Sequence, residues 1–181
     1  MDAAEGVVTL RGREVYVREG DLILLHDRGI VSWLIGLFNA QWSHVATVVV
    51  HEKRLVAFSV YQKPDGLVME LLERYDSDFF SRLAIVRPYV RRSALQTMRL
   101  REAVQGIMRA HAANPRDAYD HGVAECAHAL FKMRPASEDR YICSELAARL
   151  ARAAGAWPEH RSVSVKIDDL AWLVGRTEVV F

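Results

Sequence analysis

The sequence predicts an α+β fold, because a block of short strands precedes most of the helices. Between residues 14 and 86, runs of β-branched and apolar residues alternate with turns such as Glu19-Gly20 and Pro64-Asp65-Gly66. From Ser93 onward, apolar residues recur at helical spacing instead. This order of elements is typical of α+β domains. At 181 residues, 51% of them hydrophobic, the chain is long enough for one domain, 1–181, with a proper core.

The strands are expected mainly in the first half of the chain. His44 to Val50 is a continuous β-branched run, the pattern of a strand that is buried on both faces. The polar turn Glu52-Lys53-Arg54 follows, and Leu55 to Tyr61 then returns, so the two runs predict a hairpin. The expected strands cover residues 14–17, 21–25, 44–50, 55–61, 67–72, 83–86 and 177–181.

The helices are expected mainly in the second half. Ser93 and Gln96 fit a capping box at the start of a long helix, which Asn114-Pro115 ends. Gly155 suits the position just after the helix that begins at Cys143. The expected helical segments are 30–39, 93–113, 122–132, 143–154 and 167–174.

One cysteine stands at the start of a predicted helix. An extended segment, Arg140-Tyr141-Ile142, runs into Cys143, and a helix-forming stretch follows at once. A thiol in this position lies beside backbone N–H groups without helical partners and at the positive end of the helix dipole. That setting favours the thiolate, which is the nucleophilic form. A buried packing cysteine is the alternative, and the polar neighbours Ser144 and Glu145 count against it.

A partner for this thiol is His44, far upstream, at the head of the β-branched run. A cysteine at a helix start and a histidine on a strand form the skeleton of a papain-like cysteine hydrolase, although a purely structural histidine is the alternative. His51 stands near the far end of the same strand, ~20 Å away at ~3.3 Å per residue, so one site cannot contain both histidines. No group of His and Cys residues has zinc-site spacing, and the sequence predicts neither a metal nor a cofactor.

Four short motifs occur in a particular order along the chain. Gly20-Asp21-Leu22-Ile23 comes first, then Trp42-Ser43-His44-Val45, then Tyr119-Asp120, and finally Cys143-Ser144-Glu145-Leu146, with Asp168-Asp169-Leu170 near the end. This order resembles the circularly permuted form of the NlpC-type papain-like cysteine peptidases, the YiiX/YebB-like group, whereas the cysteine motif comes first in ordinary NlpC proteins. The resemblance implies a papain-like fold, with a small antiparallel sheet or barrel packed on helices.

Carried over to these motifs, the resemblance implies that Cys143 is the nucleophile and His44 the base. It implies that Tyr141 lines the site or helps to hold an oxyanion, with a core aromatic as the alternative. Trp42 and Ser144, which lie in the motifs of the two reactive residues, are the other candidate binding residues.

The chain departs from the group at the polar residue that orients the histidine. The group carries a glutamate on the strand after the histidine strand, and the corresponding position here is Phe58. Glu52 and Ser59 are the candidate replacements, with Gln62 and Glu70 as further alternatives. Without an orienting group the imidazole tautomer is less fixed and the rate falls, so the departure leaves room for a weakened or inactive protein.

The sequence therefore predicts a cysteine hydrolase that forms an acyl-enzyme on a peptide amide or on a lipid ester or thioester. The alternatives are a catalytically weak or inactive binding module on the same fold, and an acyltransferase or an effector domain. The formal net charge of +1 gives no support to a nucleic-acid function. The basic cluster around Arg91-Arg92 and Arg99 leaves peripheral membrane contact open, and the sequence does not indicate an oligomeric state.

Location is expected from the segments at the start of the chain. Residues 1–6 are acidic and lack the basic and apolar regions of a signal peptide. The apolar run Ile30 to Phe38 is about half as long as the roughly twenty residues that a membrane-spanning helix needs. The sequence therefore predicts a cytoplasmic protein, with both cysteines, Cys126 and Cys143, reduced.

Overall fold

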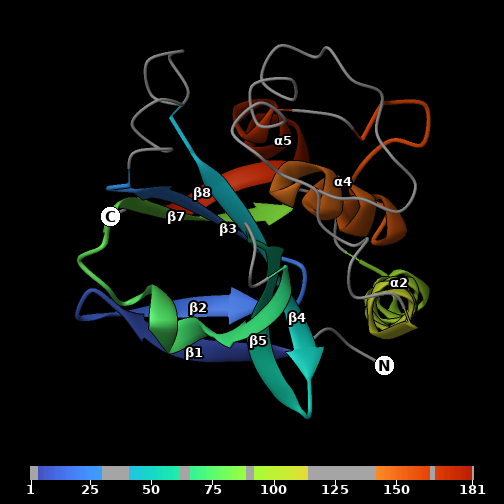
Figure 1. Cartoon of the computed structure of the whole chain (residues 1–181), viewed down its shortest axis with the longest axis horizontal. Coiled ribbons are helices and arrows are strands. Elements are labelled where there is room, and N and C mark those ends of the chain that lie inside the picture. The colour runs from blue at the N-terminus through green and yellow to red at the C-terminus, as the bar shows by residue number, and fades with distance from the viewer. Residues whose placement is uncertain are drawn as a thin grey trace.

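A six-stranded antiparallel sheet and a two-stranded hairpin form the β part of the fold (Figure 1). The computed structural model describes residues 4–29, 41–61, 66–88, 92–113, 142–163 and 166–180, with the backbone alone for residues 171–180. The strands are β1 (Glu5–Leu10), β2 (Arg13–Arg18), β3 (Leu22–Asp27), β4 (His44–His51), β5 (Arg54–Val60), β6 (Leu67–Leu71), β7 (Phe80–Pro88) and β8 (Gly175–Val180). The helices are η1 (Leu72–Tyr75), a 3-10 turn, and α2 (Ala94–Ala113), α4 (Cys143–Ala153) and α5 (Ile167–Val174).

The strand order of the large sheet is β6-β5-β4-β3-β7-β8, and every neighbouring pair is antiparallel. β1 pairs with β2 in the separate hairpin. Strands grouped before helices, joined in antiparallel pairs, confirm the predicted α+β class. The predicted hairpin of the histidine strand is also confirmed, because β4 pairs with β5 across the turn at Glu52 and Lys53.

The helix boundaries follow the capping residues in the sequence. At the start of α2, the Ser93 N–H donates to Gln96 Oε1 at 2.8 Å and the Gln96 N–H donates to Ser93 Oγ at 3.3 Å, which is the predicted capping box. After α4, Gly155 has the left-handed φ of 72° that suits a helix end. Within the described ranges, no helix combines the length and the apolarity needed to cross a membrane.

Several elements differ from the expectation: η1 was not predicted, β3 and β8 have shifted bounds, and β1 and β7 differ most. β1 was not predicted, because Gly6 and the exposed Val7 break its apolar pattern, and it is defined by pairing with β2. The turn between them, Arg11-Gly12, has positive φ at both residues, as a tight hairpin turn requires. β7 is longer at both ends than the predicted 83–86. The expected helices 30–39 and 122–132 lie outside the described residues.

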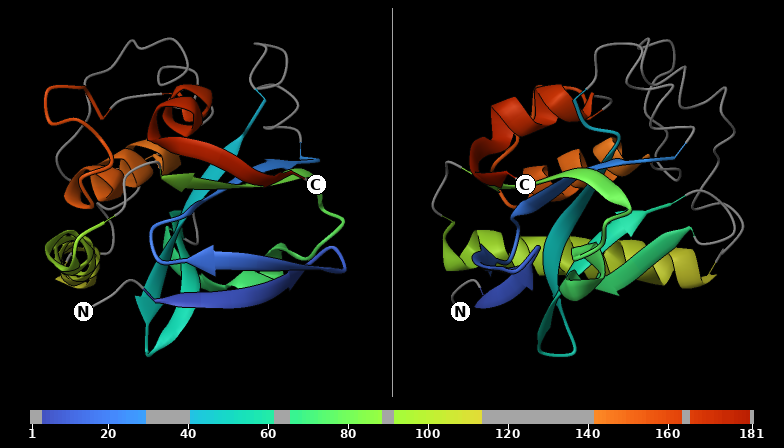
Figure 2. Two further views of the ribbon diagram at one scale, coloured as in Figure 1. Left: turned by 180° about the vertical axis from the view of Figure 1, so that it is seen from behind. Right: turned by 90° about the vertical axis from the view of Figure 1, so that its left-hand side faces the viewer.

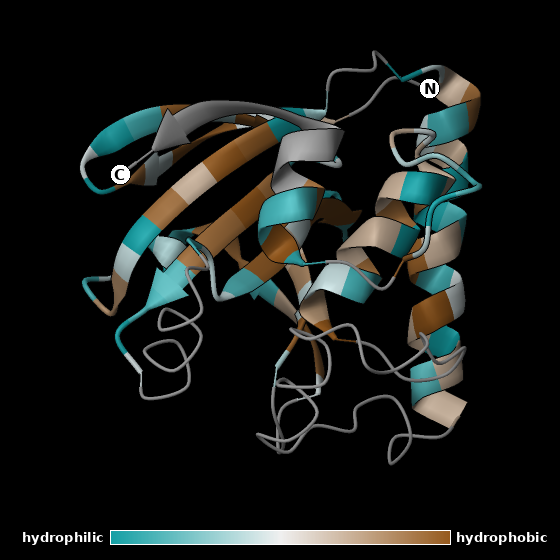
Figure 3. Cartoon of the chain, turned by 90° about the horizontal axis from the view of Figure 1, so that it is seen from above, coloured by the Kyte–Doolittle hydropathy of each residue, from teal (hydrophilic) through white to brown (hydrophobic). Residues whose placement is uncertain are grey.

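β4 lies between two layers of side chains. The helices α4 and α5 lie on the opposite side of the sheet from the β1–β2 hairpin in two views (Figure 1, Figure 2). Val45 and Val49 of β4 join the clusters that include α4, whereas Ala46 and Val48 join the cluster that includes β1 and β2. The strands in the middle of the fold are accordingly coloured as hydrophobic along much of their length in Figure 3. Burial on both faces confirms the prediction from the β-branched run.

A pair of fully buried carboxylates anchors the turn between β2 and β3. Arg101 of α2 donates to Glu19 through Nε and Nη2, at 2.8 and 2.6 Å. Arg87 of β7 donates to Asp21 through Nε and Nη2, at 3.3 and 2.9 Å. Such two-pronged pairs satisfy buried charges with fixed geometry. They fasten α2 and β7 to the same turn, which leads into β3.

Gly20 in this turn is expected to tolerate alanine poorly. Its φ is +83°, and a Cβ there would overlap the guanidinium group of Arg92. Gly12 is the matched control, with a φ of +70° and open space around it. We expect Gly12→Ala and Gly20→Ala each to cost about 1 to 2 kcal/mol from the backbone conformation, because the Arg92 guanidinium is the end of a flexible side chain and can move aside. Urea denaturation measures both, and a much larger loss for Gly20→Ala would show that Arg92 is held in place.

Candidate functional site

His44 is the first residue of β4, and its imidazole has contacts on two sides. In the sheet register, His44 lies opposite Leu25 of β3. The imidazole stacks on the ring of Tyr61, with centroids 4.4 Å apart and planes at 17°. Its Nε2 lies 2.8 Å from the Oγ of Ser59, which is 1% exposed. β5 and the residue just after it thus supply both an edge contact and a face contact.

The contacts of Ser59 determine the tautomer of the imidazole. The Ser59 hydroxyl lies 2.8 Å from the backbone carbonyl oxygen of Val45, to which it donates its single proton. Towards His44 the Ser59 oxygen must therefore accept, so the imidazole carries its proton on Nε2 and keeps the lone pair on Nδ1. Because the hydroxyl proton points at Val45 and not at the imidazole, Ser59 is an orienting group and not an activated nucleophile.

Electrostatics keep this imidazole neutral. Burial lowers the pKa of His44 to about 4, and the negative charge of Asp27 on β3 opposes the shift. His44 is half-buried by its surface, but its ring is enclosed by neighbouring side chains and disfavours the charged form. At neutral pH the ring is therefore unprotonated, and its low pKa makes it a weak base in this resting environment.

Cys143 is the first residue of α4, where the sequence predicts the helix to begin. Ile142 before it is extended, with φ −92° and ψ 162°, and makes no side-chain hydrogen bond to the helix. The first N–H groups of a helix have no partner within it, so a negative charge on the thiol is stabilised there. Ser144 and Glu145 in the first turn are buried, and Trp42 lies buried with Ala147 of the same helix.

The thiol and the imidazole approach β4 from different faces. Cys143 packs against the clusters on the helix side, to which Val45 belongs. Leu25, which lies opposite His44, belongs to the cluster on the hairpin side. Because side chains alternate along a strand, His44 is directed to the other face from Val45. The imidazole nitrogen that remains for the thiol is Nδ1, because Nε2 lies at Ser59.

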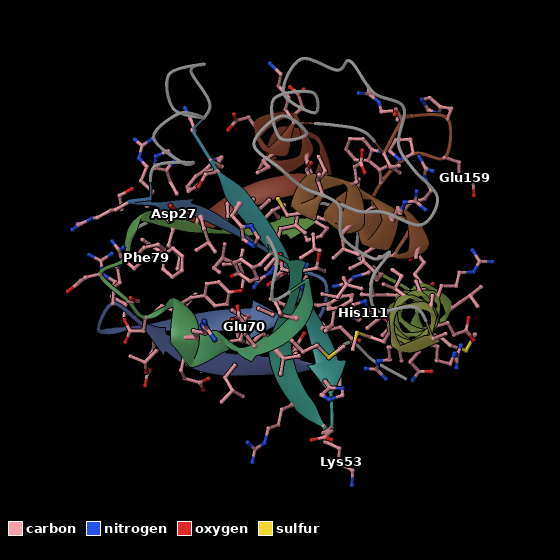
Figure 4. The ribbon with its side chains drawn as sticks, viewed as in Figure 1. Asp27, Lys53, Glu70, Phe79, His111 and Glu159 are labelled. Atoms are coloured by element: carbon pink, nitrogen blue, oxygen red, sulfur yellow. The ribbon has the colours of Figure 1, made fainter. Side chains whose placement is uncertain are left out.

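The structure separates Glu52, one of the two candidate orienting residues, from the imidazole. Glu52 lies in the turn after β4 with a φ of 48°, its side chain 84% exposed and 3.9 Å from His51. Figure 4 shows its neighbour Lys53 at the tip of this hairpin. His44 is at the other end of the strand, ~20 Å away or more at ~3.3 Å per residue. The place that Glu52 was expected to fill beside His44 is occupied by Ser59.

The other residues considered for this role have different positions. Phe58 pairs with Thr47 and is fully buried on the helix side of the sheet. Glu70 of β6 does not touch the imidazole, but it accepts a hydrogen bond from Tyr75 at 3.1 Å. Gln62 and the candidate binding residue Tyr141 lie outside the described residues.

Two contacts around the site were not expected from the sequence. The Tyr61 ring is one, and continuing the predicted hairpin register to the start of β4 would have placed it opposite His44. The other is Asp168 at the start of α5, whose carboxylate accepts a hydrogen bond from the Gln41 N–H at 3.3 Å. This contact ties α5 to the segment that leads into β4. It joins residues 127 positions apart, so no local sequence pattern predicts it.

Ser59→Ala is expected to release the imidazole from its single tautomer. The variant removes the acceptor of the Nε2 proton and leaves the Val45 carbonyl without its donor, which costs about 1 to 3 kcal/mol of stability. NMR spectra of the His44 ring nitrogens should then show a mixture of tautomers. Glu52→Ala is the control and should change neither quantity. Retention of the Nε2–H tautomer in Ser59→Ala would contradict the assignment.

The low pKa of His44 predicts a loss of stability in acid. Its pKa is about 4 in the folded protein and near 6.5 in the unfolded chain, so the unfolded chain binds the proton more tightly. The contribution is complete above about pH 6.5 and is lost as the pH falls through about 4, at most about 3 kcal/mol. Urea denaturation of the wild type and of His44→Gln isolates this term from other acid groups. Parallel pH dependence in the two proteins would refute it.

No family model matches the sequence, and no curated protein matches it. A similar solved structure is that of the metalloprotein YiiX from Escherichia coli O157:H7. The TM-score is 0.54 at 19% sequence identity, and the match covers 75% of this chain and 65% of that chain, just under two thirds of the neighbour's length. At this identity the similarity shows the fold alone. The chain therefore has a YiiX-like α+β fold, as the order of its motifs predicted.

Proposed function

We propose that this protein is a cysteine hydrolase that works by acyl transfer, with Cys143 as the nucleophile and His44 as the base. The observation that carries the proposal is the position of Cys143 as the first residue of α4, a helix that packs against the strand beginning with His44. A helix N-terminus supports the thiolate, and a neutral imidazole is the form that accepts the thiol proton.

The proposed reaction has two steps. The thiolate sulfur of Cys143 attacks the carbonyl carbon of the substrate, and backbone N–H groups at the start of α4 stabilise the negative oxygen. The bond to the leaving amine, alcohol or thiol breaks as that group takes the proton from the His44 imidazolium. Water then attacks the acyl-enzyme, gives a proton to His44 and releases the carboxylic acid and the thiol. In an acyltransferase, another acceptor replaces the water.

The imidazole has one nitrogen that Ser59 does not engage. Its Nε2 lies at Ser59, so Nδ1 is the atom that takes the thiol proton in the proposed reaction. Hydrogen bonds between catalytic groups often shorten only in the substrate complex, so the Nδ1–thiol contact is expected to form there.

The substrate class follows from this chemistry. The reaction suits a peptide amide or a lipid ester or thioester, since each presents a carbonyl carbon to a thiolate. YiiX is described as a metalloprotein. Within the ranges that the structure describes, no three His, Cys, Asp or Glu side chains group together as metal ligands, and the proposal assigns no metal.

A non-catalytic binding module is the second candidate function. One observation favours it, the buried Phe58 at the position of the expected acid. Nitrophenyl esters and peptide amides separate the two functions, because only the hydrolase gives an acyl adduct on Cys143 by mass spectrometry. A ligand that raises the melting temperature without such an adduct would favour the binding module.

Alkylation by iodoacetamide tests the proposal directly. At about pH 6.5 we expect Cys143 to react about tenfold faster than an ordinary thiol, because an ordinary thiol of pKa about 8.5 is almost fully protonated there. Cys126 in the same chain is the internal comparison. His44→Ala should slow Cys143, whereas His51→Ala, at the exposed far end of β4, should not. Equal rates for the two cysteines, or no effect of His44→Ala, would contradict the proposal.

A further inference from the structure

We propose that Tyr61 is a positioning residue for the His44 imidazole, and that a hydrogen-bonded chain through Tyr75 to Glu70 holds Tyr61 in place. The inference rests on the proposed function only for the role of His44 as the base. Its structural content is independent of that role, since it concerns the plane, the tautomer and the hydration of one imidazole.

The stack between His44 and Tyr61 covers one face of the imidazole. A centroid distance of 4.4 Å and an interplanar angle of 17° place the two rings in direct, nearly parallel contact. The Ser59 hydroxyl meets the ring edge at Nε2. An edge contact alone leaves the ring able to pivot about the hydrogen bond, whereas an edge and a face together define its plane.

The Tyr61 hydroxyl is the first link of a chain that runs away from the imidazole. It lies 3.2 Å from the hydroxyl of Tyr75 in η1, and Tyr75 donates to Oε2 of Glu70 at 3.1 Å. Glu70 also contributes a side-chain hydrogen bond to the causes that raise the pKa of Tyr61, so both tyrosines interact with this carboxylate. The other oxygen of Glu70 pairs with Nη1 of Arg74 at 2.9 Å.

The two tyrosines of the chain keep one protonation state across the accessible pH range. Burial is the largest cause that raises the pKa of Tyr61 and of Tyr75, so both hydroxyls keep their protons. Tyr75 is fully buried and belongs to the cluster on the hairpin side of the sheet, which fixes the middle of the chain. At the other end of the chain, the exposed Arg74 side chain contacts Glu70.

The sequence has Phe58 where a carboxylate that orients the imidazole was expected. The hydrogen-bonded chain provides such an orientation indirectly. The carboxylate of Glu70 does not orient the imidazole by contact, but it anchors the ring on which the imidazole rests. The charged and titratable groups around the imidazole are then Asp27 from β3, Tyr61 after β5, and Tyr75 and Glu70 behind it. Loss of the Tyr61 ring admits water to the imidazole and removes its fixed plane.

NMR titration of the His44 ring in the full-length protein tests the inference. With Tyr61→Ala, we expect the pKa of His44 to rise from about 4 by at least about one unit towards 6.5, because the charged ring gains solvent. Tyr61→Phe keeps the stack and should move the pKa by less than about half a unit. Tyr16→Phe is the control, since Tyr16 is an exposed tyrosine on β2 that bonds to Glu5 instead.

A second comparison tests whether Tyr75 acts through Tyr61. Tyr75→Phe should broaden or shift the His44 ring signals in the wild-type background and have no further effect in Tyr61→Ala. Thermal unfolding checks that each variant folds, and Tyr61→Leu replaces Tyr61→Ala where the latter does not. An unchanged His44 pKa and tautomer in a folded Tyr61→Ala or Tyr61→Leu protein, or equal shifts in Tyr16→Phe, would overturn the inference.

Alkylation of Cys143 in the same variants separates this inference from the proposed function. If the His44 signals change as expected while Cys143 reacts like an ordinary thiol in every variant, the hydrolase proposal fails and the positioning role stands. If Cys143 is reactive and depends on His44, but the His44 signals ignore Tyr61, the positioning role fails and the hydrolase proposal stands.

Discussion

The burial of β4 on both faces is the constraint on which the rest of the structure depends. Its helix-side residues pack under α4 and its other residues pack against the β1–β2 hairpin, so the strand cannot rotate or slip without exposing one apolar set. That register decides where His44 points, because the first residue of the strand must follow the same alternation. It also decides where Cys143 lies, since α4 is seated on the other face. The register of one strand thus places the backbone positions of both proposed reactive groups.

The same register lets neutral side chains orient the His44 imidazole without a carboxylate beside it. Ser59, Tyr61 and the chain to Glu70 all come from β5, β6 and the segments next to them, on the same face as His44. A serine that donates to a backbone carbonyl is a neutral acceptor, so it defines the tautomer without stabilising an imidazolium as a carboxylate would. A site built in this way favours the neutral imidazole. It stabilises the thiolate–imidazolium pair that follows proton transfer less than a carboxylate would.

The sequence predicted the parts of the fold that have local causes. The β-branched run of β4, the capping box of α2 and the helix start at Cys143 each carry their own signal. Ser59 was one of several candidates, because the choice among them depends on the hairpin register. That register is set by a two-residue turn at Glu52 and Lys53, both with positive φ, and no glycine in the sequence announces such a turn. The position of Tyr61 opposite His44 follows from the same hairpin register, whereas the link from Asp168 to Gln41 depends on tertiary packing and has no local sequence pattern.

The proposed chemistry requires that the start of α4 stabilises the Cys143 thiolate and that His44 accepts the thiol proton. Ultraviolet absorbance of the thiolate, followed against pH in a Cys126→Ala background, measures both. We expect a thiolate midpoint well below the ordinary value of about 8.5, with a rise towards it in His44→Ala. A midpoint at the ordinary value, or one that is the same with and without His44, would rule out this chemistry.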